Sequence, residues 1–363
     1  MIIDRIDAFP LTIPFGTGAA LPGPQRPPGV TSLLVRVTTD EGHEGWGEAF
    51  GFEAAGVTRR ALEDLVAPLC TGRDATRVGP LMRAVQEKLH VFGRGGAVIH
   101  ALSAVDTALW DIAGKAAGLP LHRLLGGASG PALACYASLD PYGDPAAVRA
   151  GVRQALGAGF TDVKLHEREH ASVRAAREEA GPGTGLMLDV NCPWTLAQAK
   201  AKAGEFRDLG LKWLEEPLWP PEDYDGLARL RAACGLPLAA GENVATLLDF
   251  GRLLAAGAVD YVQPSPAKMG GVTELGKVFQ AAAARNVTVM PHTFYHGPGL
   301  LAAVHATAAL GTADSMIEWR YTDLEARVYG EAVLPAAGQI QVPQGPGLGA
   351  DPDPEVLRRY RSG

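Results

Sequence analysis

The stretch from residue 186 to residue 217, LMLDVNCPWTLAQAKAKAGEFRDLGLKWLEEP, decides the fold class. It opens and closes with short apolar runs, LMLDVN (186–191) and KWLEEP (212–217), and an alanine-rich helical segment lies between them. A strand, a helix and a second strand in that order are typical of a parallel βα unit. The stretch therefore predicts two parallel strands joined by a helix.

The same unit recurs along most of the chain. Eight short apolar runs are separated by alanine-rich helical stretches, and they occupy residues 134–138, 161–166, 186–191, 212–217, 238–243, 260–265, 287–292 and 316–319. Eight parallel βα units close into a TIM-type barrel, which takes about 250 residues by itself. The sequence therefore predicts an α/β protein built on a modified (β/α) barrel with seven to eight βα units.

The segments that flank the barrel have a different character. Residues 1–13 and 31–50 alternate apolar and polar side chains as strands do, and the loop 14–30 between them is rich in Pro and Gly. From about 57 to 125, apolar residues recur at helical spacing. The predicted parts are an N-terminal α+β capping domain (1–127), the catalytic barrel (128–325) and a C-terminal segment (326–363) that packs back on the capping domain and completes it.

Composition limits the partners and the location. The 363 residues carry a net charge of −7 and 47% are hydrophobic. The chain can therefore bury a large core, and it lacks the basic surface that nucleic acids or anionic membranes require. Charges within the first seven residues argue against a signal peptide, and no apolar run reaches the ~18 residues of a membrane helix. With four scattered cysteines, we expect a cytoplasmic protein, and the alanine-rich outer helices are compatible with a homo-oligomer.

Polar residues recur at or near the ends of the predicted barrel strands. They are spaced by 23 to 27 residues, one βα unit each time, and are Lys164, Asp189, Glu215, Glu242, Ser265, His292 and Glu318. Any one of them alone could be an ordinary solvated residue at a strand–loop junction. Because side chains at the carboxyl ends of barrel strands point into one mouth, seven in phase indicate an active site there.

Three successive strands contribute carboxylates, namely Asp189, Glu215 and Glu242. Three converging carboxylates repel one another, and a hard divalent cation relieves that repulsion. Ligands that are all oxygen favour Mg²⁺ over zinc. The alternative is a carboxylate cluster that Lys164 and Lys268 neutralise without a metal.

Two positions could supply a catalytic base. Lys164 and His166 share one face of the second barrel strand, and His292 ends the seventh, across the mouth. A metal that binds a substrate carboxylate, with Lys or His alongside, stabilises the enediolate that forms when the α-proton leaves. A histidine at a barrel mouth can also be hydrogen-bonded scaffolding, so both readings stay open for His166 and His292.

Several motifs resemble those of the enolase superfamily. They are ALWDIAGKAAGLPLHRLLGG (108–127), the lysine of DVKLH (162–166), LMLDVN (186–191), WLEEP (213–217), GEN (241–243), KMGG (268–271), IEW (317–319) and GQIQVPQGPGLG (338–349). Together they make the chain similar, over essentially its whole length, to the mandelate racemase-like subgroup of the mandelate racemase/muconate lactonizing enzyme family. The resemblance implies a capping domain whose loops, 14–30 and 50–56 here, close over the barrel mouth and set specificity.

The resemblance also implies roles for individual residues. Asp189, Glu215 and Glu242 would be ligands of Mg²⁺, with Lys164 contacting the substrate carboxylate and His292 acting in acid/base catalysis. The resemblance further implies that Glu318 contacts the substrate, and we count Glu318 among the candidate catalytic residues with Lys164, His166 and His292. Asn191 and Lys268 are further candidates for substrate binding.

Two positions depart from the pattern of the family. His166 stands where the subgroup usually has a second lysine that acts as a base, and Ser265 stands where an aspartate usually pairs with the catalytic histidine. Without a carboxylate partner, His292 loses an interaction that raises its pKa and fixes its tautomer. His296, four residues later, is a possible substitute partner, although a loop histidine is the more ordinary reading.

This set of residues supports α-proton abstraction followed by one of three outcomes. We favour β-elimination of water from a sugar acid, because a weakly basic His292 suits a general acid, with His166 or Lys164 as the base. The alternatives are a racemase or epimerase of a 2-hydroxy or amino acid and a cycloisomerase of a sugar-acid lactone or anhydro sugar. A barrel that kept the metal site and lost its chemistry is the reading from another class. In each catalytic case the partner is a small-molecule carboxylate.

Overall fold

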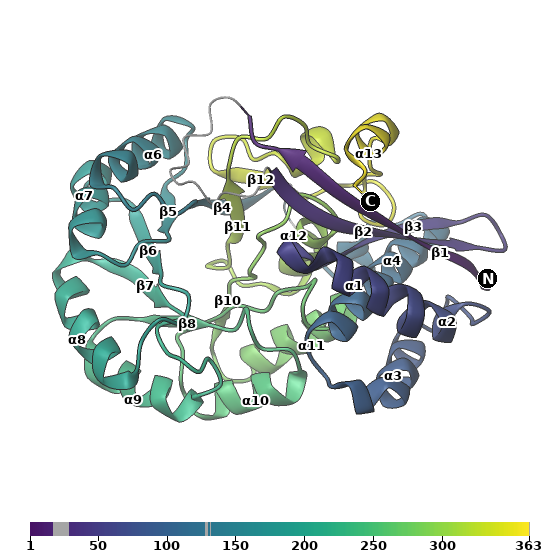
Figure 1. The fold of residues 1–363 in the computed structure, drawn as a ribbon, viewed down its shortest axis with the longest axis horizontal. Coiled ribbons are helices and arrows are strands. Elements are labelled where there is room, and N and C mark those ends of the chain that lie inside the picture. The colour runs from purple at the N-terminus through teal and green to yellow at the C-terminus, as the bar shows by residue number, and fades with distance from the viewer. Residues whose placement is uncertain (17–28, 128–129, 131, 363) are drawn as a thin grey trace.

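The computed structural model describes residues 1–16, 29–127, 130 and 132–362. A three-stranded antiparallel sheet with its own helices stands beside a curled parallel sheet that is ringed by helices (Figure 1). This arrangement confirms the predicted fold class, a modified (β/α) barrel with an N-terminal α+β domain. In the described part of the chain, no helix is both long and apolar enough to cross a membrane.

The N-terminal domain contains the predicted strands and helices. Its sheet consists of β1 (Ile3–Pro14), β2 (Gly29–Thr39) and β3 (Glu44–Ala49). Its helices are η1 (Phe52–Ala54), α1 (Ala55–Ala61), η2 (Leu62–Val66), α2 (Ala67–Cys70), α3 (Val78–Leu89), η3 (His90–Phe92), α4 (Ala97–Ala117) and α5 (Leu121–Leu124). The buried helix α4 lies directly against β3, where a Cβ on Gly47 would stand 1.9 Å from the carbonyl oxygen of Ala104. Glycine is therefore required at this crossing.

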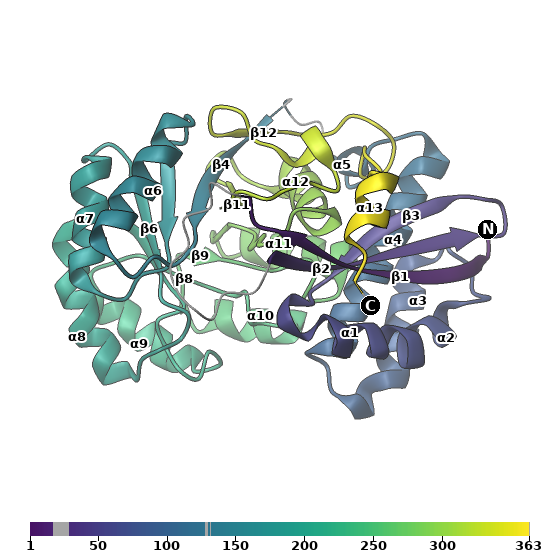
Figure 2. The same cartoon turned by 45° about the horizontal axis from the view of Figure 1, so that its top comes forward.

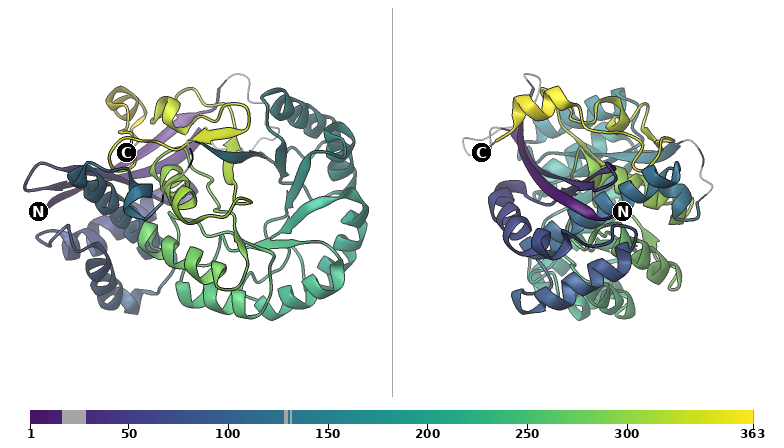
Figure 3. Two further views of the ribbon diagram at one scale, coloured as in Figure 1. Left: turned by 180° about the vertical axis from the view of Figure 1, so that it is seen from behind. Right: turned by 90° about the vertical axis from the view of Figure 1, so that its right-hand side faces the viewer.

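All eight predicted barrel strands are present and are parallel. They are β4 (Ala132–Leu139), β5 (Asp162–Leu165), β6 (Gly185–Asp189), β7 (Leu211–Glu215), β8 (Leu238–Ala240), β9 (Tyr261–Val262), β10 (Thr288–Val289) and β11 (Ile317–Tyr321). Helices follow the first seven strands: α6 (Pro145–Gly157), α7 (His170–Ala180), α8 (Leu196–Phe206) with η4 (Arg207–Leu209), α9 (Tyr224–Cys234), α10 (Leu247–Ala255), α11 (Gly271–Ala283) and α12 (Pro298–Leu310). Seen from behind, these helices form the outer layer around the strands (Figure 3).

The ring of strands differs from a fully hydrogen-bonded barrel at one seam. The sheet runs from β10 through β9 to β4 and on to β11, and among the described residues no ladder joins β10 to β11. Pro291 follows β10 closely and has no N–H that could extend a ladder. Side chains bridge the seam instead, because the Thr293 hydroxyl donates to the backbone carbonyl of Glu318 and the Thr293 N–H donates to its carboxylate, at 3.1 Å from Oε2.

The C-terminal segment contacts both parts of the molecule. It contains η5 (Gly330–Val333), β12 (Gln339–Gln341) and α13 (Pro354–Tyr360). β12 pairs with barrel strand β4, whereas α13 packs against β1 of the N-terminal sheet (Figure 2). The segment was expected to pack on the capping domain, and its pairing with the barrel was not anticipated. The domain boundaries at 127/128 and 325/326 stay predictions.

Apolar side chains fill the interior of the barrel beneath its mouth. They are Tyr136, Met187, Trp213, Ala239, Met290 and Met316. This interior is therefore a packed core and not a pore. The packing also orients one site residue, since the indole N–H of Trp213 donates to Oε2 of Glu215 at 2.8 Å.

A buried glutamate of the N-terminal domain holds the start of α12. Glu48 on β3 is 2% exposed, and its Oε2 accepts the Gly299 N–H at 3.0 Å. Burial raises the pKa of Glu48 to about 7, although the Gly299 N–H and Ser32 hydroxyl oppose the shift. The neighbouring Tyr295 and Tyr329 stay neutral because burial raises the pKa of each well above its ordinary value.

We expect the substitution Glu48→Gln to change how stability depends on pH. A carboxyl whose pKa is raised on folding stabilises the fold fully below its unfolded pKa of 4.5, and this contribution is lost as the pH rises through about 7. The variant should therefore gain up to about 3 kcal/mol relative to the wild type between pH 5 and pH 8.5. Urea denaturation at both pH values measures this difference. Glu44→Gln, on the exposed end of the same strand, serves as the control, and parallel pH profiles for wild type and Glu48→Gln would contradict the expectation.

Candidate active site

The structure brings the seven residues predicted at strand ends to one end of the barrel. Their positions are Lys164 within β5, Asp189 and Glu215 at the ends of β6 and β7, Glu242, Ser265 and His292 two or three residues past β8, β9 and β10, and Glu318 at the second position of β11. Strands β8, β9 and β10 are shorter than predicted, so three of these residues lie on loops. Direct contacts join these residues into two groups. One is Lys164 with Asp189, Glu215 and Glu318, and the other is His292 with Glu242 and Ser265.

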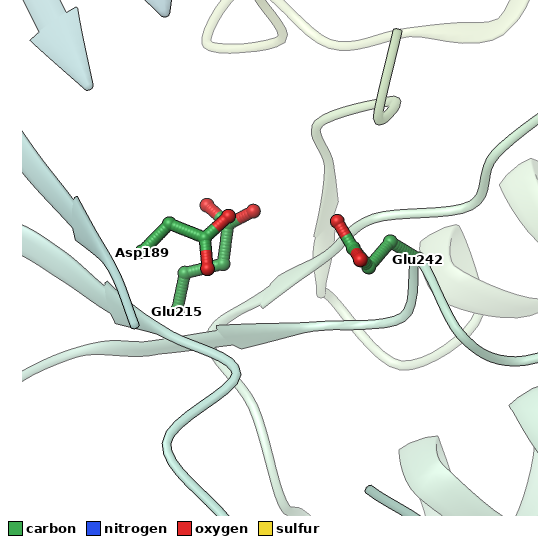
Figure 4. Close-up of side chains that lie close together, drawn as sticks. All are labelled: Asp189, Glu215 and Glu242. Carbon is green, nitrogen blue, oxygen red and sulfur yellow. The ribbon is translucent and has the colours of Figure 1, made fainter. Parts of the chain in front are cut away.

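Three carboxylates form a triad that could hold a metal ion. Asp189, Glu215 and Glu242 each offer one oxygen, and these atoms lie within 4.8 Å of one another. The carboxylates of Asp189 and Glu215 lie side by side, and that of Glu242 faces them across a gap (Figure 4). A set of carboxylate oxygens suits a hard divalent cation such as Mg²⁺ and does not suit zinc, which prefers nitrogen and sulfur ligands.

Lys164 lies beneath this triad as a buried cation. It is 0% exposed, and its Nζ lies 2.7 Å from Glu215 Oε1, 2.8 Å from Glu318 Oε1 and 3.2 Å from Asp189 Oδ2. Burial acts to lower the pKa of Lys164, but the surrounding carboxylates outweigh it and raise the pKa well above its ordinary value. Lys164 is therefore held protonated, which suits a cationic contact and not a base.

One lysine does not balance the charge of this cluster. Burial and the charge of Asp189 raise the pKa of Glu215 well above its ordinary value despite the contact with Lys164. Burial acts likewise on Asp189, but Lys164 and His166 outweigh it and lower the pKa of that group. Lys268, the second lysine proposed from the sequence to neutralise the cluster, donates to Asn243 Oδ1 at 3.0 Å, and its charge acts to lower the pKa of Glu242. The excess negative charge is what a divalent cation would compensate.

His166 stands at the Asp189 end of the triad. Its Nδ1 lies 2.5 Å from the carbonyl oxygen of Leu139, and its Nε2 lies 3.4 Å from Asp189 Oδ2. A carbonyl oxygen only accepts hydrogen bonds, so Nδ1 carries a proton. Burial acts to lower the pKa of His166, but the Asp189 carboxylate that faces Nε2 outweighs it and raises that pKa. Nε2 is the nitrogen that gains or loses a proton when the ring titrates.

His292 stands at the other end, against Glu242. Its Nε2 lies 3.0 Å from Glu242 Oε2, and its Nδ1 lies 3.2 Å from the hydroxyl oxygen of Ser265. Burial acts to raise the pKa of Glu242, but His292 outweighs it and the pKa falls to about 2. The Ser265 hydroxyl in turn contacts the hydroxyl of Tyr295 in a short hydrogen bond.

His296 does not take the place of the missing aspartate. Its Nδ1 lies 3.0 Å from Nη1 of Arg327, and its ring packs edge-on against Trp319. The group that completes the surroundings of His292 is Tyr295, which the sequence analysis missed. The available signal was Ser265 itself, because a buried hydroxyl beside a histidine usually needs a second partner.

The ring of Phe294 lies near both histidines, and the sequence analysis did not predict it. The ring of Phe294 lies 6.0 Å from that of His166 and 6.2 Å from that of His292. Behind it, the guanidinium of Arg320 stacks at 4.0 Å from the ring centroid and pairs with Asp140 at 3.1 Å. Phe294 therefore presents an apolar face between two polar groups.

The remaining residues expected at the site occupy its rim and its floor. Asn191 is exposed, and its backbone N–H donates to Asp189 Oδ1 at 2.9 Å. Glu318 is 0% exposed, at the floor beside Lys164. Glu216 follows the last residue of β7, and its Oε1 accepts the Gly241 N–H at 3.1 Å. Most of the loop 14–30 lies outside the described residues, whereas the loop 50–56 contains η1.

Comparisons with known proteins agree with this geometry. The Mandelate racemase / muconate lactonizing enzyme, N-terminal domain model matches residues 29–126, and the Enolase C-terminal domain-like model matches residues 147–356. D-galactarolactone cycloisomerase of Agrobacterium fabrum is 30% identical over 348 residues, which cover 91% of each chain. D-galactonate dehydratase of Verminephrobacter eiseniae is 35% identical over 276 residues, which cover 72% of this chain and 71% of the relative.

A solved structure shows the same fold over the full length of both proteins. It is the crystal structure of a racemase from Streptomyces coelicolor A3(2) with bound magnesium, at a TM-score of 0.88 and 28% identity, and it covers 99% of this chain and 100% of the racemase. The two family models account for most of the barrel and most of the N-terminal domain. The chain is therefore a member of the mandelate racemase/muconate lactonizing enzyme family, and thus an enolase-superfamily lyase or isomerase.

Proposed function

We propose that the protein is a Mg²⁺-dependent acid-sugar dehydratase. The observation that carries this proposal is that the two histidines at the ends of the carboxylate triad differ in the partner of Nδ1. That partner is the Leu139 carbonyl for His166 and the Ser265 hydroxyl for His292. Elimination needs one base and one acid, whereas racemisation needs two groups of similar strength. Relatives named as dehydratases of galactonate and arabinonate support a sugar-acid substrate.

In this proposal, Asp189, Glu215 and Glu242 hold the metal. Bound Mg²⁺ supplies positive charge beside the substrate carboxylate and so favours the enediolate that forms as the α-proton leaves. Lys164 adds a second fixed positive charge from below. In this proposal Asn191 and Lys268 bind the substrate, and Glu318, which contacts Lys164 at 2.8 Å, holds that lysine in position.

The two histidines then divide the proton transfers. The C–H bond at the α-carbon breaks as Nε2 of His166 takes the proton, because its Nδ1 keeps a proton on the Leu139 carbonyl. The C–O bond at the β-carbon breaks as His292 donates a proton, so the hydroxyl leaves as water. The remaining enol tautomerises to a 2-keto-3-deoxy acid.

A cycloisomerase is the second candidate. Relatives named D-galactarolactone cycloisomerase and 3,6-anhydro-alpha-L-galactonate cycloisomerase are each 30% identical to this chain. The same two proton transfers would apply, except that the leaving oxygen belongs to a ring of the substrate and no water is lost. Only the product distinguishes this candidate from a dehydratase.

A screen of sugar acids, sugar-acid lactones and anhydro-sugar acids with Mg²⁺ tests the proposal. We expect 2-keto-3-deoxy products, detected as semicarbazones, from at least one open-chain sugar acid. The Glu242→Gln variant should give none, because it removes one charged metal ligand. Conversion of lactones or anhydro sugars alone would favour the cycloisomerase. Exchange or inversion at the α-carbon without any elimination would refute both candidates and support a racemase.

A further inference from the structure

A glutamate side chain completes the hydrogen bonding between β7 and β8 where these strands end. The N–H of Glu216 donates to the Ala239 carbonyl at 3.0 Å, so the next bond of a parallel ladder would join the Gly241 N–H to the Glu216 carbonyl. Glu216 has a φ of +47°, and its carbonyl accepts the Cys192 N–H at 2.7 Å instead. The Gly241 N–H donates to the side-chain Oε1 of Glu216 at 3.1 Å. The side chain of Glu216 therefore takes the place of its own backbone in the ladder.

The second carboxyl oxygen of Glu216 holds two further donors. Oε2 accepts from the side-chain amide of Asn243 at 3.1 Å and from the thiol of Cys192 at 2.7 Å. Glu216 is 3% exposed and its bond to Gly241 is buried, so water competes little for that bond. All three partners are donors, and only a side chain with two acceptor oxygens can satisfy them together.

Glu242 is the member of the carboxylate triad that depends most on these contacts. It lies two residues past the end of β8, whereas the other two members are the last residues of β6 and β7. Gly241, the residue before it, has a φ of +139°, a conformation that favours glycine, and glycine is the least restricted residue. Glu216 contacts the residue on each side of Glu242, namely Gly241 and Asn243. It therefore holds the turn that carries the third carboxylate.

We infer that Glu216 is a positioning residue that fixes Glu242 where its carboxylate can share a metal ion with the other two. Its contacts set the backbone on both sides of Glu242, and so the direction from which that carboxylate approaches the triad. Residues that hold metal ligands in place typically contribute 10–100-fold to metal affinity. The inference rests on the proposed function in one respect, namely that the triad binds Mg²⁺.

Calorimetric titration with Mg²⁺ alone measures the contribution of Glu216. We expect Glu216→Gln to raise the Kd about tenfold or more, because glutamine has one acceptor oxygen and its NH₂ group must face a donor. Glu216→Asp keeps the carboxylate but is one methylene shorter, so it should weaken binding to a similar extent. Weakening in Glu216→Gln alone would show that Glu216 acts only through its charge, and would overturn the inference.

Asp111→Asn is the matched control, because the two carboxyl oxygens of Asp111 also hold backbone N–H groups. Asp111 is 0% exposed on α4, and it accepts from Trp46 at 2.9 Å and from Leu348 at 2.8 Å. None of these three residues lies on a barrel strand or on a loop that carries the triad. The variant should lose stability in urea and still bind Mg²⁺ within about twofold of the wild type. Equal weakening in Asp111→Asn would trace the effect to general destabilisation and contradict the inference.

Amide hydrogen exchange tests the same contacts without Mg²⁺ and without turnover. In the presence of a chelator, we expect the Gly241 amide to exchange about tenfold or more faster in Glu216→Ala, which removes both acceptor oxygens, than in the wild type. Amides of β6 should exchange alike in both proteins. An unchanged Gly241 amide would overturn the inference, as would a Kd within about twofold of the wild type in both Glu216→Gln and Glu216→Asp. If the wild type binds no Mg²⁺, the proposed function fails, and hydrogen exchange alone decides whether Glu216 holds the turn.

Discussion

The substitution Lys164→Met is expected to lower the free energy of unfolding by about 3–5 kcal/mol in the absence of divalent cations. Methionine fills a similar volume but leaves Asp189, Glu215 and Glu318 without the cation that each now contacts within 3.2 Å. The cost arises because the carboxylates remain buried once their partner is gone. Mg²⁺ should restore part of the loss, since it supplies the missing positive charge to the same oxygens.

Urea denaturation with a chelator and with Mg²⁺ measures both effects. Lys212→Met is the matched control, because Lys212 pairs with Asp162 at 2.8 Å on a partly exposed part of the barrel. Its loss should cost no more than about 1 kcal/mol and should not respond to Mg²⁺. If Lys164→Met were as stable as Lys212→Met without metal, the carboxylates would not carry the charge assigned to them. If Mg²⁺ stabilised wild type and Lys164→Met equally, the ion would not bind beside Lys164.

The barrel strands could be predicted from the sequence because buried strands consist mainly of apolar residues. Strands covered by helices read as continuous apolar runs, and all eight runs became strands. The ends of β8, β9 and β10 could not be predicted in the same way. Glu242 and His292 lie two and three residues beyond the last residues of β8 and β10. The pattern of apolar and polar residues in the sequence does not show where the backbone hydrogen bonds between strands end.

The members of the site could be predicted for a related reason. A polar residue at the end of each βα unit indicates a common site, because the carboxyl ends of the strands meet at the barrel mouth. The structure does bring Asp189, Glu215 and Glu242 together. Their roles did not follow from spacing. The protonated state of Lys164 depends on Glu215, Glu318 and Asp189 acting together. Glu318 lies 154 positions away along the chain and approaches because β11 returns to pair with β4.

The partner of His292 lay beyond sequence reasoning for a different reason. Tyr295 is on an irregular segment between β10 and α12, where no helical or strand period relates one side chain to the next. The pairing of β12 with β4 escaped prediction likewise, because three residues in a segment rich in Pro and Gly carry too little pattern. Tertiary contacts alone decide such positions.

The substitution His292→Asn is expected to separate two steps that the wild type performs together. If His292 is the acid and His166 the base, the variant should still remove the α-proton but fail to expel the β-oxygen. Loss of a general acid lowers the rate of elimination by about 10²–10⁴-fold. His166→Asn should instead lose α-proton removal and elimination together, because the first step precedes the second.

Incubation with Mg²⁺ and an active sugar acid in D₂O measures both rates by NMR. In His292→Asn we expect deuterium at the α-carbon of recovered substrate, at a rate within about tenfold of wild-type turnover, with almost no 2-keto-3-deoxy product. His166→Asn should give neither signal. The opposite pattern is exchange in His166→Asn and none in His292→Asn. It would exchange the two roles and contradict the proposed assignment of His166 as the base and His292 as the acid. Equal loss of exchange in both variants would mean that both histidines take part in removing the α-proton, as a two-base racemase requires.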